Sequence, residues 1–303
     1  MAVRLALRED SLSISTIVAA LALETDSDPV AGRAIQLARQ HEARLIFVHA
    51  VEDAIPIHDL PVSLDVSVLH AIVKRNAADR IRQLTGNPES EATVKIVIET
   101  GKPYRIIDEI VQREDADLVI IGPGKAKNMR EKVFGSTADR VVRTARQPIL
   151  VVRSSVASPY RHIAAAADFS TASRAAAKAA SRLAPDAAIE LVHAVETPLA
   201  FEQAMLRAGT SQKEINGYRR ARASEARRQI SASLEEHDLP LVRARLRIVH
   251  GDAAQALVRL TRRCRTDLMA LGTHGGNALS QMLLGSVTRH VLRAAGCDVL
   301  VSA

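Results

Sequence analysis

One segment of the chain has glycines and a serine at spacings that suit phosphate binding. It reads GTHGGNALSQMLLGSV, and its candidate ligands are Gly272, Gly275, Gly285, Ser286 and Val287. Glycines let the backbone approach a ligand closely and expose amide donors. The last three residues are expected to open a helix, where free N–H groups and the helix dipole favour an anion. The chemistry on offer is therefore the binding of a phosphate group.

An acidic residue, Asp168, ends another apolar run, HIAAAAD, in the same half of the chain. Its carboxylate could accept a ribose hydroxyl or hold a phosphate-bound metal ion. A purely structural interpretation also exists, because glycines can simply turn the chain and Asp168 or Ser286 can cap a helix. Their occurrence together, each at the end of an apolar run, favours a nucleotide site. His274 has no acid or nucleophile beside it in sequence, so we expect an exposed loop histidine and no catalytic residue.

The elements that must position these residues occur twice in the chain. LIFVHAVED at 45–53 returns as IELVHAVET at 189–197, and DLVIIG from Asp117 returns as DLMALG from Asp267. Over the second part of each copy the offset is a constant 150 residues (267 minus 117). Self-similarity at a fixed offset indicates a duplicated domain.

Two domains are therefore predicted, at 1–153 and 161–303, with a linker at 154–160. Their lengths are ordinary for single α/β domains. His49 and His193 occupy matching places near the ends of second strands, and their recurrence suggests a shared structural role.

Short apolar runs alternate with helix-length segments in each copy. In the second copy the expected strands are 162–168, 189–195, 242–251, 267–272 and 298–302, and the expected helices are 171–184, 212–236, 253–264 and 280–294. Continuous apolar strands are typical of a parallel sheet that is covered on both faces. The order predicts two tandem doubly wound α/β domains, each with a five-stranded parallel sheet flanked by helices. Ligands in that architecture bind beyond the carboxyl ends of the strands.

This arrangement resembles the universal stress protein family, and the resemblance covers nearly all of both halves. The family's nucleotide-binding members carry Gly, two residues, Gly, nine residues, then Gly-Ser or Gly-Thr, and the second half meets this pattern in full. The resemblance implies an adenine nucleotide alpha hydrolase-like fold that binds ATP, with ADP or AMP as alternatives and Mg as an accompanying ion. It implies that Asp168 faces the adenosine or the phosphates, and that the main chain at Ala194 meets adenine. The implied nucleotide-binding residues are Asp168, Ala194, Leu271, Gly272, Thr273, Gly275, Gly285, Ser286 and Val287.

The first half departs from this pattern. Its segment GPGKAKNMREKVFGST keeps Gly122, Gly135 and Ser136 but places Lys125 where the second glycine should be. The side chain of Lys125 would occupy space that the phosphates need. We therefore expect the first domain to have lost nucleotide binding, with its basic loop facing a partner or solvent.

Two other positions of the first half differ from the second. Pro123 stiffens the turn after the first glycine and removes an amide donor. Aligning the helices that follow the first strands places Glu24 opposite Asp168. That alignment is gapless but weak, so Asp26 and Asp28 stay open as alternatives.

The composition excludes several function classes. The 303 residues contain no Trp and only four Phe and three Tyr, so a platform for stacking bases, and with it nucleic acid as a partner, is not expected. The net charge of +7 has its densest run at 219–228, which we interpret as a solvated helix face. Cys264 and Cys297 lie outside metal-ligand spacing and indicate a reducing cytosol, hence a cytoplasmic protein without a metal site. No stretch reaches the length of a membrane span.

The expected function is that of a non-catalytic, ATP-binding stress-response regulator with one nucleotide site, in the second domain. Nucleotide binding would order the glycine segment and change the surface offered to a protein partner, which the sequence does not identify. Two alternatives remain: a slow ATP or dinucleotide hydrolase on the same fold, and a nucleotide-independent interaction module that uses the basic surface. The resemblance also implies an internal pseudo-dimer of the two domains through their last strands, and it leaves a homodimer open.

Overall fold

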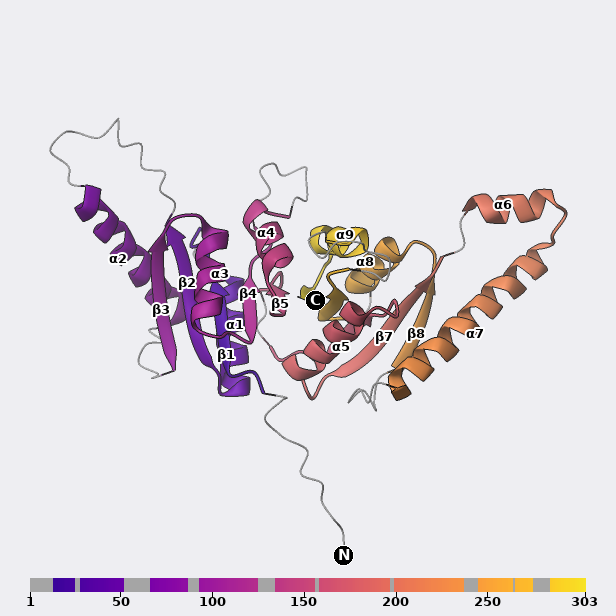
Figure 1. The fold of residues 1–303 in the computed structure, drawn as a ribbon, viewed down its shortest axis with the longest axis horizontal. Coiled ribbons are helices and arrows are strands. Elements are labelled where there is room, and N and C mark those ends of the chain that lie inside the picture. The colour runs from indigo at the N-terminus through magenta and orange to yellow at the C-terminus, as the bar shows by residue number, and fades with distance from the viewer. Residues whose placement is uncertain are drawn as a thin grey trace, which may run out of the picture. The chain divides into compact units, whose positions relative to one another are not determined.

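The computed structural model of the chain has two compact units, with the division between Pro159 and Tyr160. The residues that it describes are 13–24, 28–51, 66–86, 93–124, 134–155, 158–196, 199–236, 245–263, 265–274 and 284–303. Each unit is a parallel sheet with helices on both faces (Figure 1).

The first unit has its sheet in the order β3-β2-β1-β4-β5, with all neighbours parallel. Its strands are β1 (Thr16–Ala20), β2 (Arg44–Val51), β3 (Val94–Thr100), β4 (Leu118–Ile121) and β5 (Ile149–Val151). Its helices are α1 (Pro29–His41), α2 (Val66–Thr85), α3 (Pro103–Arg113) and α4 (Ser136–Thr144). Helix α1 contacts α2 and α3 contacts α4, as right-handed crossovers on opposite faces of one sheet require.

The second unit repeats this order as β8-β7-β6-β9-β10, again with parallel neighbours. Its strands are β6 (His162–Ala166), β7 (Ala188–Val195), β8 (Arg245–His250), β9 (Leu268–Gly272) and β10 (Asp298–Ser302). Its helices are α5 (Thr171–Leu183), α6 (Leu199–Arg207), α7 (Gln212–Glu236), α8 (Ala253–Arg263) and α9 (Ser286–Ala294). Helix α8 contacts α9, and α6 contacts α7.

The predicted fold class is confirmed: two tandem doubly wound α/β domains, each with a five-stranded parallel sheet. The continuous apolar runs are buried strands, since every residue of β4 and β10 is buried. Helices dock by one apolar face, as α3 does with Ile106, Ile107, Ile110 and Val111. Helix α6 was not predicted; the segment before 212 was expected to be a plain connection. In the described part of the chain, no helix is both long and apolar enough to cross a membrane.

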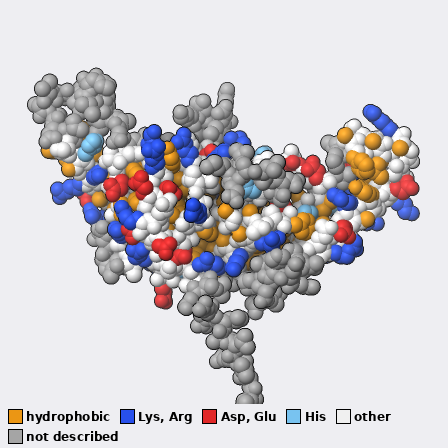
Figure 2. Space-filling model, viewed as in Figure 1, with side chains coloured by type: hydrophobic (Ala, Val, Ile, Leu, Met, Phe, Trp, Pro, Cys, Tyr) orange, Lys and Arg blue, Asp and Glu red, His pale blue; other side chains and the backbone are white. Residues whose placement is uncertain are grey.

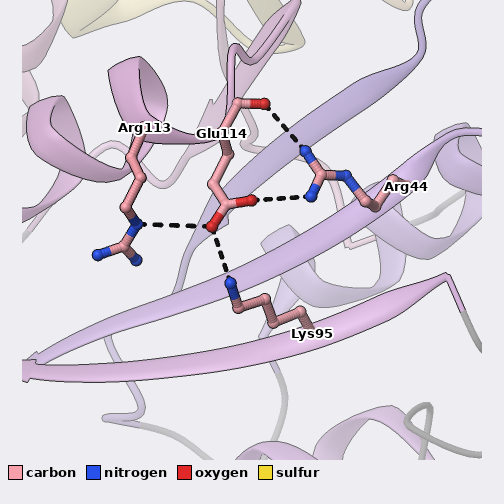
Figure 3. Close-up of polar contacts among 4 residues, drawn as sticks. All are labelled: Arg44, Lys95, Arg113 and Glu114. Atoms are coloured by element: carbon pink, nitrogen blue, oxygen red, sulfur yellow. Dashed lines mark hydrogen bonds and ion pairs between the residues drawn. The ribbon is translucent and has the colours of Figure 1, made fainter.

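A cluster of charges ties α3 to the amino-terminal edge of the first sheet (Figure 3). The Glu114 carboxylate follows α3 and accepts hydrogen bonds from Arg44 at the start of β2 and Lys95 at the start of β3, both at 2.8 Å. Arg113 lies 3.5 Å from the same carboxylate. These contacts lower the pKa of Glu114, with the Lys95 hydrogen bond as the largest cause. The cluster is structural, because parallel strands place their ligand-binding edge at the opposite end.

Candidate functional site

The segment after β9 is held to the rest of its sheet by backbone hydrogen bonds at Thr273. The Thr273 amide donates to the Ser302 carbonyl (2.9 Å), and the Gly285 amide donates to the Thr273 carbonyl (2.8 Å). The amides of Thr273 and Gly285, two of the predicted ligand-binding residues, are therefore already hydrogen-bonded within the second unit. Gly285 is the N-cap of α9, and no side chain caps the first turn of that helix. Of the predicted residues at this helix start, Ser286, which is exposed, and Val287, which is half-buried, keep their amides for a ligand.

Gly272 has a structural reason to be glycine. A Cβ atom at this position would lie 2.8 Å from Ala172 C and 2.8 Å from Ser173 N, in the first turn of α5. A side chain there would push α5 away from the end of β9. The counterpart in the first unit, Gly122, has only Val30 Cγ2 nearby, at 3.6 Å, which is an ordinary contact.

Thr288 was not predicted as part of the site. Its hydroxyl donates to the Gly272 carbonyl at 2.7 Å, and its side chain is buried. This bond fixes the first turn of α9 against the end of β9. The position matches Ala138 in the first half (288 minus 150), so the difference between the repeats was the available signal.

Asp168 is exposed just beyond β6 and holds the turn that leads into α5. Its Oδ1 accepts from the Ser170 amide (3.0 Å) and the Ser170 hydroxyl (2.5 Å). Ser170 in turn caps α5 by accepting from the Ser173 amide at 3.0 Å. Asp168 therefore does not cap the helix itself but supports the residue that does. Ser170 Oγ also lies 3.4 Å from the His274 carbonyl, which brings the β6–α5 turn beside the segment after β9.

The two repeated histidines make the same contact in each unit. His49 Nδ1 lies 2.8 Å from the Leu21 carbonyl, and His193 Nδ1 lies 2.6 Å from the Ala167 carbonyl. Because a carbonyl oxygen only accepts, Nδ1 carries the proton in both rings. Each histidine thus ties the second strand to the residue just beyond the first strand, in agreement with the expected structural role.

These contacts establish which residues of the two loops are equivalent. Leu21 and Ala167 match, so Ala22 stands opposite Asp168. One residue later the backbone of both units adopts a left-handed conformation, with φ of 58° at Leu23 and 68° at Phe169. The expected pairing of Glu24 with Asp168 is therefore wrong by two residues when the strands are superposed.

Of the alternatives to Glu24, Asp28 lies directly before α1. Asp28 is the N-cap of that helix and accepts from the Val30 amide at 2.9 Å. Burial is the largest cause of the raised pKa of its carboxyl. Asp28 thus has the capping role that Ser170 has in the second unit. The other predicted positions that bear on the loops, Asp26, Lys125 and Gly275, lie outside the described residues.

Comparison with known proteins agrees with the two-unit architecture. The family model described as universal stress protein family matches the chain twice, at residues 13–153 and 159–302. The chain belongs to the universal stress protein family.

Curated relatives match one universal stress domain at a time. Universal stress protein MJ0531 of Methanocaldococcus jannaschii is 30% identical over 139 residues, which are 44% of this chain and 81% of that protein. Universal stress protein A homolog 1 of Coxiella burnetii is 32% identical over 148 residues, which are 46% of this chain and 94% of that protein. Among solved structures, a universal stress protein from Archaeoglobus fulgidus superposes with a TM-score of 0.65 at 15% identity, covering 95% of this chain and 97% of that one. That likeness concerns the fold.

The loop of the first universal stress domain takes a different path after its strand. The Gly135 amide donates to the Pro123 carbonyl at 2.9 Å, as Gly285 does to Thr273. Gly124 has φ of 76°, and a Cβ there would lie 2.7 Å from Gly135 Cα. The backbone at Gly124 therefore passes close to Gly135, the N-cap of α4, and a residue with a side chain would not fit at position 124 without a shift.

The remaining predicted residues lie at the carboxyl edge of the second sheet. Ala194 is half-buried near the end of β7, and Leu271 is buried near the end of β9. Because β6, β7 and β9 are parallel, Asp168, Ala194 and the segment after β9 share one edge. Over the described ranges, no group of three or more His, Cys, Asp or Glu side chains is arranged to hold a metal ion.

Proposed function

We propose that the second domain of this universal stress protein binds an adenine nucleotide, with ATP as the preferred ligand, and that the first domain does not. The observation that carries the proposal is the start of α9. Its first turn has no side-chain cap, and the Gly285–Thr273 bond holds it beside the carboxyl end of β9. Uncapped N–H groups at a helix N-terminus favour phosphate. The first domain differs at this edge, because Pro123 and Gly124 stand where the second domain has Thr273 and His274.

The other residues of this edge suit the rest of a nucleotide. Asp168 uses only its Oδ1 for Ser170, so its Oδ2 can accept a ribose hydroxyl or join a magnesium ion on the phosphates. Mg²⁺ needs only one or two carboxylates when phosphates and water supply the remaining ligands. The main chain at Ala194 would meet the adenine. The Ser286 hydroxyl, which is exposed, would add a donor to a phosphate oxygen.

We propose binding without hydrolysis. The acidic candidate, Asp168, has one carboxylate oxygen committed to the turn before α5, and a hydrolase needs a general base positioned on the attacking water. A nucleotide that is held and released unchanged would act as a signal, by changing the surface of the second domain at this edge. A protein partner would read that change. A cytoplasmic location, the internal pseudo-dimer and a homodimer stay predictions.

The test is the nucleotide content of the purified protein. Chains are denatured, and the adenine nucleotide released per chain is identified and counted by chromatography. We expect about one nucleotide per chain in the wild type and none in Gly275→Lys, which copies the lysine of the first domain. The reverse change, Lys125→Gly, tests whether the lysine side chain alone keeps the first domain empty, since it would then raise the count to two. No binding by the wild type, even after titration with Mg-ATP, would overturn the proposal.

The basic face of α7 supports a second candidate, a nucleotide-independent interaction surface. Arg220, Arg222 and Arg227 are exposed, whereas the ion pairs within the described part of α6 and α7 use Arg219 and Arg228. Helix α6 also exposes Phe201 and Leu206, which are 45% and 50% accessible. Figure 2 shows hydrophobic side chains at the end of the molecule that carries α6. Cations beside exposed apolar side chains are typical of a docking surface. Salt-dependent capture of an acidic protein by nucleotide-free protein, lost on charge reversal at the three arginines, would favour this candidate.

A further inference from the structure

Two arginines of the first domain gather around one tyrosine ring. The guanidinium carbon of Arg140, in α4, lies 4.6 Å from the centroid of the Tyr104 ring in α3, and that of Arg105 lies 5.9 Å from it. Arg105 Nε also donates a hydrogen bond to the Tyr104 hydroxyl at 3.2 Å. Helices α3 and α4 are in contact, side by side (Figure 1). With the N-cap residue of α3, these side chains form the α3–α4 cluster: Lys102, Tyr104, Arg105 and Arg140.

The three cations of the α3–α4 cluster act together on the Tyr104 phenol. The hydrogen bond from Arg105 is the largest cause of the lowered pKa of Tyr104, and the charges of Arg105, Arg140 and Lys102 also lower that pKa, against the opposing effect of burial. The three cations are exposed, and the Tyr104 side chain is half-buried. The cluster is therefore a patch of positive charge that a partner can reach.

The place of this charge is unfavourable for stability. Lys102 and Arg105 lie at the start of α3, whose first turn contains no acidic residue. Positive charge near a helix N-terminus is destabilising, because the helix dipole is itself positive there. The acidic residue in the first turn of α4, Asp139, pairs with Arg143 at 2.7 Å. The fold thus gives no reason for placing three cations together here.

The second domain shows the ordinary arrangement at the same place. Its counterparts of the α3–α4 cluster, at the 150-residue offset, are Asp252, Ala254, Gln255 and His290. Asp252 Oδ1 accepts a hydrogen bond from the Gln255 amide at 2.8 Å, at the start of α8. An acidic residue that caps a helix in this way stabilises it. The first domain has a lysine where the repeated fold has an acidic cap, which points to a role in binding.

The chemistry of the cluster suits carboxylates on a polypeptide. Guanidinium groups bind carboxylates through two parallel hydrogen bonds. Tyrosine and arginine are the residues that often supply most of the binding energy at protein interfaces. Nucleic acid fits less well, because Arg140 lies over the Tyr104 ring and occupies a face on which a base would stack.

We propose that the α3–α4 cluster is a docking site for an acidic segment of a protein partner, whose carboxylates bind the three cations. Tyr104 is the positioning residue, because its ring and hydroxyl hold the two arginines. The site belongs to the first domain and does not depend on nucleotide binding by the second.

The test follows the binding of a fluorescently labelled hexaglutamate peptide to the full chain by anisotropy, with hexaglutamine as the uncharged control. We expect hexaglutamate to bind in a salt-dependent way, and hexaglutamine not to bind. The triple variant Lys102→Gln, Arg105→Gln, Arg140→Gln should lower hexaglutamate affinity about tenfold or more. Absence of hexaglutamate binding by the wild type at millimolar concentration would overturn the proposal.

The matched control removes three charges from another helix. The variant Arg220→Gln, Arg222→Gln, Arg227→Gln has the same net charge as the first triple variant, and it should bind hexaglutamate as the wild type does. Equal losses in the two variants would mean attraction by net charge alone, and a loss confined to the α7 variant would place the surface on α7. Either result overturns the proposal. So does displacement of the peptide by an equal concentration of inorganic phosphate, or tighter binding of a single-stranded oligonucleotide to the same cluster.

A second measurement separates a binding role from a structural one. Lys102→Asp gives α3 the acidic cap that α8 has, so this variant should unfold at the same temperature as the wild type or higher. Its hexaglutamate affinity should nevertheless fall. If Lys102→Asp unfolds at a lower temperature and binds hexaglutamate as the wild type does, the cluster serves folding and the inference fails.

Discussion

Replacing Gly272 by alanine tests whether this glycine is required for the packing of α5 against the end of β9, apart from any role in ligand binding. The new Cβ would lie 2.8 Å from two backbone atoms of α5, Ala172 C and Ser173 N, and 2.9 Å from Ala172 Cβ. Backbone atoms of a helix turn cannot rotate away as the end of a flexible side chain can. Either α5 or the end of β9 must move.

The matched control is Gly122→Ala at the same place in the first domain. There the Cβ meets only Val30 Cγ2, at 3.6 Å, and φ of neither glycine is in the left-handed region. Overpacking of this kind costs about 1–3 kcal/mol, whereas alanine at a compatible glycine position stabilises by about 0.4–1 kcal/mol. The two substitutions are therefore expected to change stability in opposite directions.

Thermal unfolding followed by circular dichroism and calorimetry measures both variants without nucleotide. Gly272→Ala should lower the transition of its domain by roughly 3–10 °C, because each kcal/mol shifts a domain of this size by about 2–4 °C. Gly122→Ala should leave its transition unchanged or raise it. Equal losses in the two variants, or a stable Gly272→Ala protein, would show that α5 does not pack as closely on β9 as the described contacts require.

Three further substitutions test single contacts. The hydrogen bond from Lys95 is the largest cause of the lowered pKa of Glu114. The Glu114 carboxylate therefore stabilises the fold fully at pH values above the ordinary glutamate pKa, and this stabilisation is lost as the pH falls through the lowered pKa. Glu114→Gln should cost about 1 kcal/mol at neutral pH in urea unfolding and flatten that pH dependence; an unchanged slope would contradict this. Thr288→Val should cost about 1 kcal/mol by removing the buried hydrogen bond to β9, and a cost near zero would mean that the bond does not hold α9. Arg33→Ala should lower the free energy of unfolding by about 2 kcal/mol or more, since Arg33 is buried and donates to the Ser158 carbonyl at 2.5 Å. Limited proteolysis should then cut the adjoining linker faster in the variant than in the wild type. Equal cutting rates would contradict the Arg33–Ser158 contact.

Much of the architecture follows from local patterns in the sequence. The continuous apolar runs predict buried parallel strands, and the predicted helix at 212–236 coincides with α7. The glycine spacing and the strand ends point to one edge of the second sheet. These features depend on the period of apolar residues and on turn chemistry, which neighbouring residues determine. Helix α6 escaped prediction because it is short and its contacts are tertiary: Glu202 pairs with Arg219 of α7, and Phe201 packs on Tyr218.

The pairing of Glu24 with Asp168 went wrong because the loops differ in length. Leu23 and Phe169 are equivalent. In the first domain the N-cap of the next helix, Asp28, follows five residues later, whereas in the second domain the N-cap, Ser170, follows one residue later. The difference of four residues lies between a matching strand and a matching helix. An alignment of either element alone cannot reveal it, whereas the histidine contacts to the strand ends do.

The duplication, the α/β class and the edge at which the candidate site lies can be predicted from the amino-acid sequence, because periodicity and spacing are local properties. Which of the candidate groups are available depends on long-range packing. It committed the amides of Thr273 and Gly285 to internal bonds, gave Gly272 a packing role, and left Nε2 of His274 buried without a partner. Each outcome depends on distances of a few ångströms between segments far apart in the chain, and long-range packing alone sets those distances.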